Sequence, residues 1–554
     1  METLANNTLK VWQEEGRQLI PQNYAEFRRL LLQAKDLQER GNYEAAAVYG
    51  QIAANYAQLN HCGFFISFEL EQLLLTIGRQ AIAINHYPSK DTVFAGTAKN
   101  ILHVSTHLSN IGGISRLMRR WIQQDTERSH SVALTRQAPN EVPQNLRDAV
   151  VNSQGKIYVL NDHSGGIISR AKRLRECAAA ADIVVLHTWE YDVVPTIAFA
   201  NKEQSPAIIY TNHGDHWFWL GVAISDAVAN LRESGMHLSL ERRGIEAKRN
   251  LVLPTILEPA CRELSRSQAK QQLGIDPHSV MLLSIARSVK FRTVDGVSFA
   301  DAHVELLKRY EQAILVVIGA GNSNEDWSAA IEQTQGRILV LGETKDTAVY
   351  YQAADIYVDS FPFVSITSIL EAGSYGVPAV SRYPYPSNSC GVLGSDMPGL
   401  ADNLIRVRDL QEYTAVLSGL IEDEQYRLSL GEATKNKIAQ THWGNNWQSA
   451  LNDIYAYVMA LPRKTATLDC IDEMSLGEPD VFLPSVNQTH ISKVMHWHMP
   501  LMPLEQRLRL WIDLVRKYGF RNNPLNVLLT EKWRSRYYLL RSRYWSRLRF
   551  LPKR

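Results

Sequence analysis

The sequence predicts an α/β protein of two facing doubly wound domains, with a helical N-terminal segment and a basic helical C-terminal tail. Two successive sets of near-continuous apolar runs alternate with helical stretches, which is typical of parallel sheets covered on both faces. Such sheets bind ligands outside the carboxyl ends of their strands, so we expect a site in the cleft between the domains. The first set, within 96–265, is ILHVST, SVALTRQ, KIYVLND, DIVVLHT and AIIYTNH, and the second, within 266–462, is VMLLSIAR, AILVVIG, ILVLG, DIYVDS and PAVS.

Composition indicates a soluble globular protein, because 45% of the 554 residues are apolar and 21% are charged. The formal net charge of +2 is uneven: 504–554 holds fourteen Lys or Arg and three Asp or Glu, a net of +11, which leaves −9 elsewhere. No run of about eighteen apolar residues spans a bilayer, and Met1 to Pro21 lacks the apolar core of a signal peptide. We therefore expect a cytoplasmic protein. The five cysteines are far apart, which argues against a zinc ribbon or a disulfide framework: Cys62, Cys177, Cys261, Cys390 and Cys470.

The N-terminal region, 1–95, reads as helices over 24–39, 43–59 and 64–84. The first pair resembles one tetratricopeptide hairpin, and a single such repeat cannot bury both its faces. Two interpretations stay open: a cap on the neighbouring domain, or a platform for a protein partner.

The stretch Ala354 to Ser381 reads as strand, loop, helix and strand. The helix is expected to begin near Ile366 and to end at Gly376, a residue suited to the left-handed conformation past a helix end. The amides near Thr367 and Ser368 then form a helix N-terminus, which favours phosphate. Glu371 follows one turn later, and a carboxylate there suits a pair of hydroxyls, as on ribose.

Together with ARSVKFR (286–292) and HVSTHLSNIGGISR (103–116), this stretch resembles GT-B glycosyltransferases of the glycogen-synthase-like superfamily, the glycosyl transferases of group 1. The resemblance covers roughly 100–461 and implies two Rossmann-like domains. It also implies transfer of a sugar from a nucleotide-activated donor to an acceptor hydroxyl, with retention at the anomeric carbon. Those families carry two glutamates separated by seven intervening residues. Glu371 matches the second, whereas Phe363 stands where the first belongs.

Three cations follow the first strand of the second domain. Arg287 ends that strand, and Lys290 and Arg292 lie in the loop. Two fixed cations in a dry cleft stabilise a departing pyrophosphate without a metal ion. By spacing, Arg287 matches the family arginine, and the partner lysine position falls at Arg292, with Lys290 as the alternative. Ordinary surface charge is the plainer interpretation. The sequence has no Asp-x-Asp motif, so we expect no metal and no cofactor beside the nucleotide-diphosphate sugar, the donor substrate.

Two glycine-bearing loops are candidates for backbone contact with the donor. Gly112 and Gly113 let a backbone approach a ligand and adopt dihedrals closed to other residues. In the resembled families this loop meets the donor diphosphate or the acceptor, while a tight turn is the simpler interpretation. Gly342, after the run ILVL, is expected to present its backbone to the nucleobase.

The run Tyr210 to Trp219 closes a strand of the first domain. We expect His213 or Asp215 to face the cleft and to contact donor or acceptor hydroxyls. Zinc at His213, Asp215 and His216 is disfavoured, because a catalytic zinc site needs three fixed ligands and a supporting shell. The aromatic residues that follow suit either stacking on a sugar or core packing.

The last segment, 463–554, is predicted to be a linker, to about Val486, and a basic amphipathic tail. An anionic lipid surface and the acidic body of the same chain are the two main candidates for what the tail binds; nucleic acid is not expected. The acceptor is a glycan, a lipid-linked molecule or another hydroxyl compound. A non-catalytic GT-B-like binding or scaffold protein and a GT-B sugar epimerase remain alternatives. The tail's apolar residues recur at helical spacing: Trp533, Tyr537, Leu540, Tyr544 and Leu548.

Overall fold

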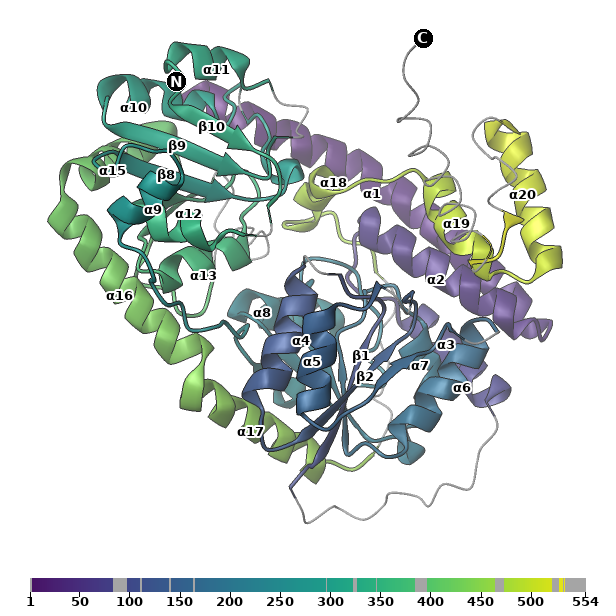
Figure 1. Ribbon diagram of the computed structural model, residues 1–554. Helices are drawn as coiled ribbons and strands as arrows, with labels where there is room; N and C mark the ends of the chain where they lie inside the picture. Colours follow the sequence, from purple (N-terminus) through teal and green to yellow (C-terminus); the bar gives the residue numbers. More distant parts are fainter. Residues whose placement is uncertain are drawn as a thin grey trace, which may run out of the picture.

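Two separate parallel sheets, each covered by helices, form the body of the molecule (Figure 1). This confirms the predicted pair of parallel-sheet α/β domains and the helices that precede them. The computed structural model describes residues 2–82, 97–109, 112–138, 141–162, 165–294, 296–321, 326–344, 346–383, 396–463, 473–520, 528–531 and 533.

The first sheet has seven parallel strands in the order β3-β2-β1-β4-β5-β6-β7. Its strands are β1 (Asn100–Ser105), β2 (Ser129–Leu134), β3 (Ile157–Val159), β4 (Ile183–Leu186), β5 (Ala207–Asn212), β6 (Ala227–Asn230) and β7 (Asn250–Val252). The helices of this domain are α4 (Gly113–Gln124), α5 (Gln144–Asn152), α6 (Ile167–Ala178), α7 (Val194–Ala198) and α8 (Glu233–Arg243), with short 3-10 turns at Lys202–Gln204 and Ala247–Arg249.

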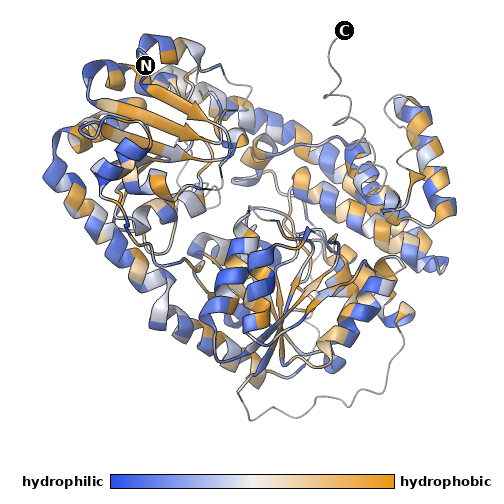
Figure 2. Cartoon of the chain, in the orientation of Figure 1, coloured by the Kyte–Doolittle hydropathy of each residue, from blue (hydrophilic) through white to orange (hydrophobic). Residues whose placement is uncertain are grey.

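The second sheet has six parallel strands in the order β10-β9-β8-β11-β12-β13. Its apolar strands are orange in Figure 2 and lie beneath mixed helices. The strands are β8 (Val280–Ile285), β9 (Ala313–Ile318), β10 (Ile338–Leu341), β11 (Ile356–Val358), β12 (Ala379–Arg382) and β13 (Leu404–Val407). The helices are α9 (Arg266–Gln272), η4 (Ser288–Lys290), α10 (Asp301–Arg309), α11 (Ser328–Gln333), α12 (Ala348–Ala353), α13 (Ile366–Ser374), α15 (Leu410–Glu422) and α16 (Glu424–His442).

Three strands, β6, β7 and β13, were not predicted. Each is only three or four residues long, and none is a continuous β-branched run: their sequences are AVAN, NLV and LIRV. Pairing with a strong neighbour, not local propensity, makes them strands. The last strand of the first sheet ends at Val252 and α9 begins at Arg266, so the predicted boundary at 265 lies between them and stays a prediction.

The predicted helix after β11 is confirmed. It runs over Ile366–Ser374, and Gly376 has φ of +71°. This left-handed conformation favours glycine and ends the helix.

One helix, α17 (Gly444–Ala460), returns from the second domain to the first. Trp447 and Leu451 are buried in one cluster with Trp121 of α4, and the Trp121 indole donates to the Tyr455 hydroxyl at 2.9 Å. The α16–α17 arm therefore ties the two domains together along one side (Figure 1).

The N-terminal helices are α1 (Glu2–Glu39), α2 (Tyr43–Leu59) and α3 (Phe68–Ala81). The predicted bounds of α2 are confirmed, whereas α1 begins near the chain start and continues through Pro21. Nearly the whole of α2 is buried, as a cap on the first domain requires. The tetratricopeptide likeness and the partner platform stay predictions.

The C-terminal segment packs on these same helices, so the chain ends form one cap (Figure 1). Its elements are η5 (Asp480–Phe482), α18 (Leu483–Val486), α19 (Ile491–His498), η6 (Met499–Leu501) and α20 (Leu504–Tyr518). The stretch to Val486 is not simply a linker, because Val481 and Phe482 are buried against α1. Buried His498 faces the side chains of Gln51 and Asn55 of α2, each at 2.9 Å.

Glu531, one of the three acids in 504–554, attaches the tail to the first domain. Glu531 pairs with Arg136 at 2.5 Å and also with Arg170, both of the first domain. The predicted tail positions Tyr537, Leu540, Tyr544 and Leu548 lie outside the described residues. Within the described ranges, no helix combines the length and apolarity needed to cross a bilayer.

A chain of buried imidazoles crosses the first sheet. His103 Nε2 lies 3.0 Å from His130 Nδ1, and His103 Nδ1 lies 3.0 Å from His187 Nε2. Burial lowers the pKa of His187 to about 3 and lowers that of His103 well below its ordinary value. The folded state therefore resists protonating His103 and His187, whereas the unfolded chain protonates these two rings near pH 6.5.

We predict that acid destabilises the protein through these rings. A depressed folded pKa gives stability that is present above about pH 6.5 and lost as pH falls towards 3. His187→Gln should make the urea unfolding midpoint less sensitive to pH between 6.5 and 4, where each pH unit is worth about 1.4 kcal/mol per ring. His278→Gln, at an exposed position, is the control. Parallel curves for wild type and His187→Gln would contradict this account.

Candidate active site

The loops at the carboxyl ends of the two sheets meet each other, as doubly wound domains require of a shared site. A Cβ added to Gly113, after β1, would lie 4.0 Å from the Thr367 hydroxyl of α13. Arg116 of α4 contacts Glu371 of α13 at 2.6 Å. Residues at the carboxyl edges of the two sheets therefore contact each other across the domain boundary, where the fold predicts the cleft.

At Gly112 the need for glycine comes from steric crowding and not from an unusual backbone dihedral angle. Gly112 has φ of 169° and ψ of 144°, an extended backbone that any residue adopts, so the expected special dihedral is not found there. A Cβ at Gly112 would instead lie 3.2 Å from the Ser109 hydroxyl. A bulkier residue would crowd this turn just before α4.

Asp359, which the sequence analysis missed, organises the loop before α13. Its carboxylate accepts from the amides of Ser360 and Ser365, both at 2.9 Å, and from the Ser381 hydroxyl at 3.0 Å. Burial raises the pKa of Asp359 to about 6, against the pull of these donors and of Lys290. The loop is thereby fixed, and the first-turn amides of α13 have no acceptor within the helix.

Thr367 and Ser368 lie half-buried in that first turn, as predicted. The Ser368 hydroxyl accepts a hydrogen bond from the Ser365 hydroxyl at 3.1 Å. Small hydroxyl side chains leave the helix N-terminus approachable from the cleft. An anion placed there meets amide donors and the positive end of the helix dipole.

Lys290 lies beside this helix start, and its ammonium donates to the Val364 carbonyl at 2.5 Å. Burial lowers the pKa of Lys290 to about 8; Asp359 opposes the shift, whereas Arg287 and Arg232 add to it. Arg287 itself is exposed. Three cations from both domains therefore act on one region.

Arg292 does not join this group. Its guanidinium donates to the Ser485 carbonyl at 2.5 Å and lies 5.1 Å from the centre of the Phe363 ring. The structure thus places Lys290 beside the start of α13 and turns Arg292 towards Ser485, while the choice between them as the partner of Arg287 stays a prediction. Phe363, at the position of the missing glutamate, packs under this arginine.

Arg232, which follows β6, was also missed, because the short run AVAN gave no strand signal. It is buried and binds Asp215 with two nitrogens, at 2.5 and 2.8 Å. Arg232 also reaches Asp396 of the second domain at 3.2 Å. The pKa of Asp215 is held well below its usual range, mainly by Arg232 against the cost of burial. Asp215 therefore orients Arg232 at the cleft.

Glu371 is engaged by the first domain. Arg116 and Arg120 of α4 lie 2.6 and 3.2 Å from its Oε1, and the Tyr351 hydroxyl donates to Oε2 at 3.3 Å. The carboxylate faces the cleft wall formed by α4. This ion-pair cluster joins the two domains, as does the pair of Arg232 and Asp396.

His213 lies at the end of β5, with both ring nitrogens near protein groups. Nε2 is 3.1 Å from the Thr188 carbonyl, and Nδ1 is 3.4 Å from Oε1 of the buried Glu190. Burial lowers the pKa of His213 to about 4 and raises that of Glu190 to about 8. Glu190 was missed, although it is the acid nearest the end of the recognised strand β4.

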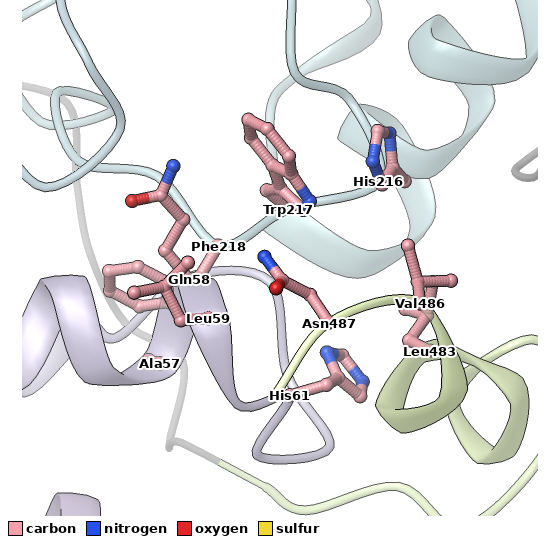
Figure 3. A pocket seen from close by; sticks show the side chains of 10 residues that line it. All are labelled: Ala57, Gln58, Leu59, His61, His216, Trp217, Phe218, Leu483, Val486 and Asn487. Atoms are coloured by element: carbon pink, nitrogen blue, oxygen red, sulfur yellow. The ribbon is translucent and has the colours of Figure 1, made fainter. Parts of the chain in front are cut away.

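A small pocket adjoins this histidine loop where three parts of the chain meet (Figure 3). The Trp217 indole and the Asn487 amide point towards each other across it, between the end of α2 and α18. Its lining residues are Ala57, Gln58, Leu59, His61, His216, Trp217, Phe218, Leu483, Val486 and Asn487.

Gly342 lies farther out. It follows β10 and is exposed, and its amide nitrogen is 2.9 Å from the Cβ position of Gly321. The loops after β9 and β10 therefore touch at the carboxyl edge of the second sheet. Across the described ranges, no three His, Cys, Asp or Glu side chains are grouped to hold a metal ion.

Part of the chain is similar in sequence to known glycosyltransferases. Residues 280–423 match the family model of glycosyl transferases group 1. A D-inositol 3-phosphate glycosyltransferase of Corynebacterium aurimucosum is 28% identical over 213 residues, 35% of this chain and 47% of that protein. The chain thus spans about half the length of this curated relative.

Solved structures share the fold. A glycosyltransferase from Rickettsia africae and Anabaena Alr3699/HepE in complex with UDP each align with a TM-score of 0.50 at 14% identity. Each alignment covers 65% of this chain, and 98% and 100% of the respective relatives. The family match and the shared fold confirm the resemblance to GT-B glycosyltransferases of group 1.

We predict unequal roles for two neighbouring arginines of α4. Arg120→Met removes a buried guanidinium from Glu371, and hydrogen bonds to charged groups contribute about 1.5–3 kcal/mol. The control, Arg119→Met, removes a pair with half-exposed Glu258, which is worth below about 1 kcal/mol. Urea unfolding should therefore show a clearly larger loss of stability for Arg120→Met. Equal losses would contradict a domain-joining role for Glu371.

Proposed function

Starting from the GT-B resemblance, we propose that this protein is a glycosyltransferase that moves a sugar from a nucleoside-diphosphate donor to an acceptor hydroxyl. The observation that carries the proposal is the position of Lys290 at the start of α13, where its ammonium donates to the Val364 carbonyl and where the charges of Arg287 and Arg232 help to lower its pKa. Grouped cations beside open helix amides favour an anion with more than one charge.

The diphosphate would bind between Lys290 and the first turn of α13, near Thr367 and Ser368. Transfer of the sugar leaves negative charge on the departing diphosphate, and preorganised donors at that position stabilise it in the transition state. Because these groups are side-chain cations and backbone amides, we propose that the reaction needs no metal ion. Retention at the anomeric carbon is carried over from the family resemblance.

Glu371 would accept the ribose hydroxyls of the donor. In the present arrangement Arg116 occupies the same carboxylate from across the cleft, with its side chain 37% exposed. Donor binding would therefore exchange an inter-domain ion pair for ribose contacts. Gly342, exposed at the carboxyl edge of the same sheet, would border the nucleobase.

We predict that Lys290→Ala weakens donor binding and slows transfer. Loss of one group that stabilises transition-state charge costs on the order of 100- to 1,000-fold in kcat. Lys308→Ala on the outer helix α10, with a side chain 43% exposed, is the matched control. Uridine, guanosine and adenosine diphosphates and their sugars are the probes, read by thermal shift and by release of free diphosphate.

A ligand at a hundred times its dissociation constant should stabilise the wild type by about 2.7 kcal/mol. Diphosphate binding without turnover of any donor would favour the non-catalytic binding protein. Equal behaviour of Lys290→Ala and Lys308→Ala would contradict the proposed site.

We further propose that the C-terminal segment contacts an anionic lipid surface. One face of α20 exposes Leu504, Leu508 and Ile512 at 63%, 40% and 41%, four residues apart. Trp533 is 60% exposed, and 504–554 carries the net charge of +11. An apolar stripe flanked by basic residues is complementary to the boundary of an acidic membrane.

We predict that the full chain floats with vesicles that contain phosphatidylglycerol and not with phosphatidylcholine alone. Replacing Leu504, Leu508 and Ile512 by serine should reduce binding by roughly tenfold or more, since each buried CH₂ contributes about 0.8 kcal/mol. Leu428→Ser on α16, at 40% exposure, is the control. Undiminished flotation of the triple variant would contradict the lipid contact.

A further inference from the structure

Glu190 is a buried acid beside the proposed cleft, and only one of its oxygens makes a hydrogen bond. It follows β4, and its side chain is 1% exposed. Gln58 of α2 donates to Oε2 at 2.7 Å. Oε1 forms no hydrogen bond to any described residue, and it lies 3.4 Å from Nδ1 of His213. A buried polar atom without a partner is costly.

The positions of protons around this pair follow from the neighbouring groups. The Thr188 carbonyl only accepts, so the His213 Nε2 at 3.1 Å carries the hydrogen. In a neutral ring, Nδ1 then presents a lone pair to Oε1. Two lone pairs would face each other unless Oε1 is protonated, whereas a protonated Oε1 donates to Nδ1 and leaves Oε2 to accept from Gln58.

The other charged groups around the pair come from the first domain. Arg243 of α8 donates to the carbonyls of Asp215 and Trp217, at 2.6 and 2.7 Å. Burial raises the pKa of Glu190 to about 8 although Arg243 opposes the shift, and burial lowers that of His213 to about 4 although Asp215 opposes it. Both directions favour the neutral pair near pH 7.

The glycine next to His213 leaves room for the Glu190 carboxyl. A Cβ at Gly214 would lie 2.2 Å from Glu190 Oε1. Glycine at this position therefore allows the carboxyl to reach the histidine. The loop TNHGD combines a histidine, the glycine that admits its partner, and Asp215, which orients Arg232.

We propose that Glu190 is a positioning residue: as a neutral carboxyl it donates to Nδ1 of His213 and fixes this ring at the acceptor side of the cleft. Gln58, which holds the other oxygen, makes the N-terminal helical segment part of the site. The inference rests on the proposed function for its catalytic consequence. The protonation of Glu190 is a property of the folded chain and does not depend on which reaction the protein catalyses.

The test compares wild type with Glu190→Gln, whose amide makes both hydrogen bonds and has no proton to lose. Since the folded pKa of Glu190 is raised, its contribution to stability is full below about pH 4.5 and is lost as pH rises through about 8. The melting temperature of Glu190→Gln should therefore rise relative to wild type from pH 5 to 8.5. Glu141→Gln, at an exposed position, should track wild type.

If Glu190→Gln does not fold, the pH dependence of the melting temperature of Gln58→Leu provides a second test. This substitution removes the donor to Oε2, so the folded-state carboxylate is less stabilised and the pKa of Glu190 rises further. The loss of stability should still begin near pH 4.5 but become larger and continue to a higher pH than in wild type. Melting curves of wild type and Glu190→Gln that stay parallel, or an unshifted curve for Gln58→Leu, would overturn the proposal.

Measurements of kcat distinguish a positioning role of Glu190 from a role as the general base. Glu190→Gln should keep kcat within about threefold of wild type at pH 7 and should lack the decline of the wild type above pH 8. A loss of 100-fold or more at every pH, the scale of general-base catalysis, would show that the carboxylate is the base and would overturn the positioning role. If wild type turns over no donor, the proposed function fails, and the melting curves still decide the state of Glu190.

Discussion

The arrangement of the proposed site depends on three positively charged side chains being held near each other. Lys290, Arg287 and Arg232 come from loops of two domains, and their mutual repulsion contributes to the lowered pKa of Lys290. Two carboxylates compensate the charge of Arg232. Asp215 accepts two hydrogen bonds from its guanidinium, and Asp396 of the second domain forms an ion pair with it. Like charges in one region disfavour each other unless opposite charge is nearby. A doubly charged ligand at the start of α13 would relieve this repulsion.

The same cleft couples the two domains through ion pairs at separate points. Glu371 meets Arg116 and Arg120 of α4, while Asp396 accepts from the Ser234 amide at 2.6 Å at the start of α8. Both acids belong to the second domain, and all three partners belong to the first. A ligand that takes one of these groups changes the contact between domains, which links binding to domain geometry.

The ends of the chain extend this coupling beyond the two sheets. α2 supplies Gln58 to Glu190, and the backbone of Ser485 in α18 accepts from Arg292 of the second domain. The cap therefore contacts both domains. Nearly all of α2 is buried, including the polar side chains of Gln51, Asn55 and Gln58, which face other parts of the chain.

Much of this arrangement could be predicted from sequence, for physical reasons. Strong apolar runs mark β1, β5 and β8, and the turn chemistry of Gly376 fixes the end of α13. Spacing could place Arg287, Lys290 and Thr367 at strand or helix ends, but it could not tell that Arg292 turns towards α18. Arg232 was hidden because its strand is short and weak, and the pair Glu190–Gln58 joins residues 132 positions apart. Contacts of that kind depend on tertiary packing, which local pattern does not encode.

The most direct test of the central claim is the crystal structure of the full chain with a nucleoside diphosphate that stabilises it. We expect the two phosphates within hydrogen-bonding distance of Lys290 Nζ and of the first-turn amides of α13, with Glu371 on the ribose. A diphosphate bound outside this cleft, with Lys290 still donating only to the Val364 carbonyl, would contradict the account.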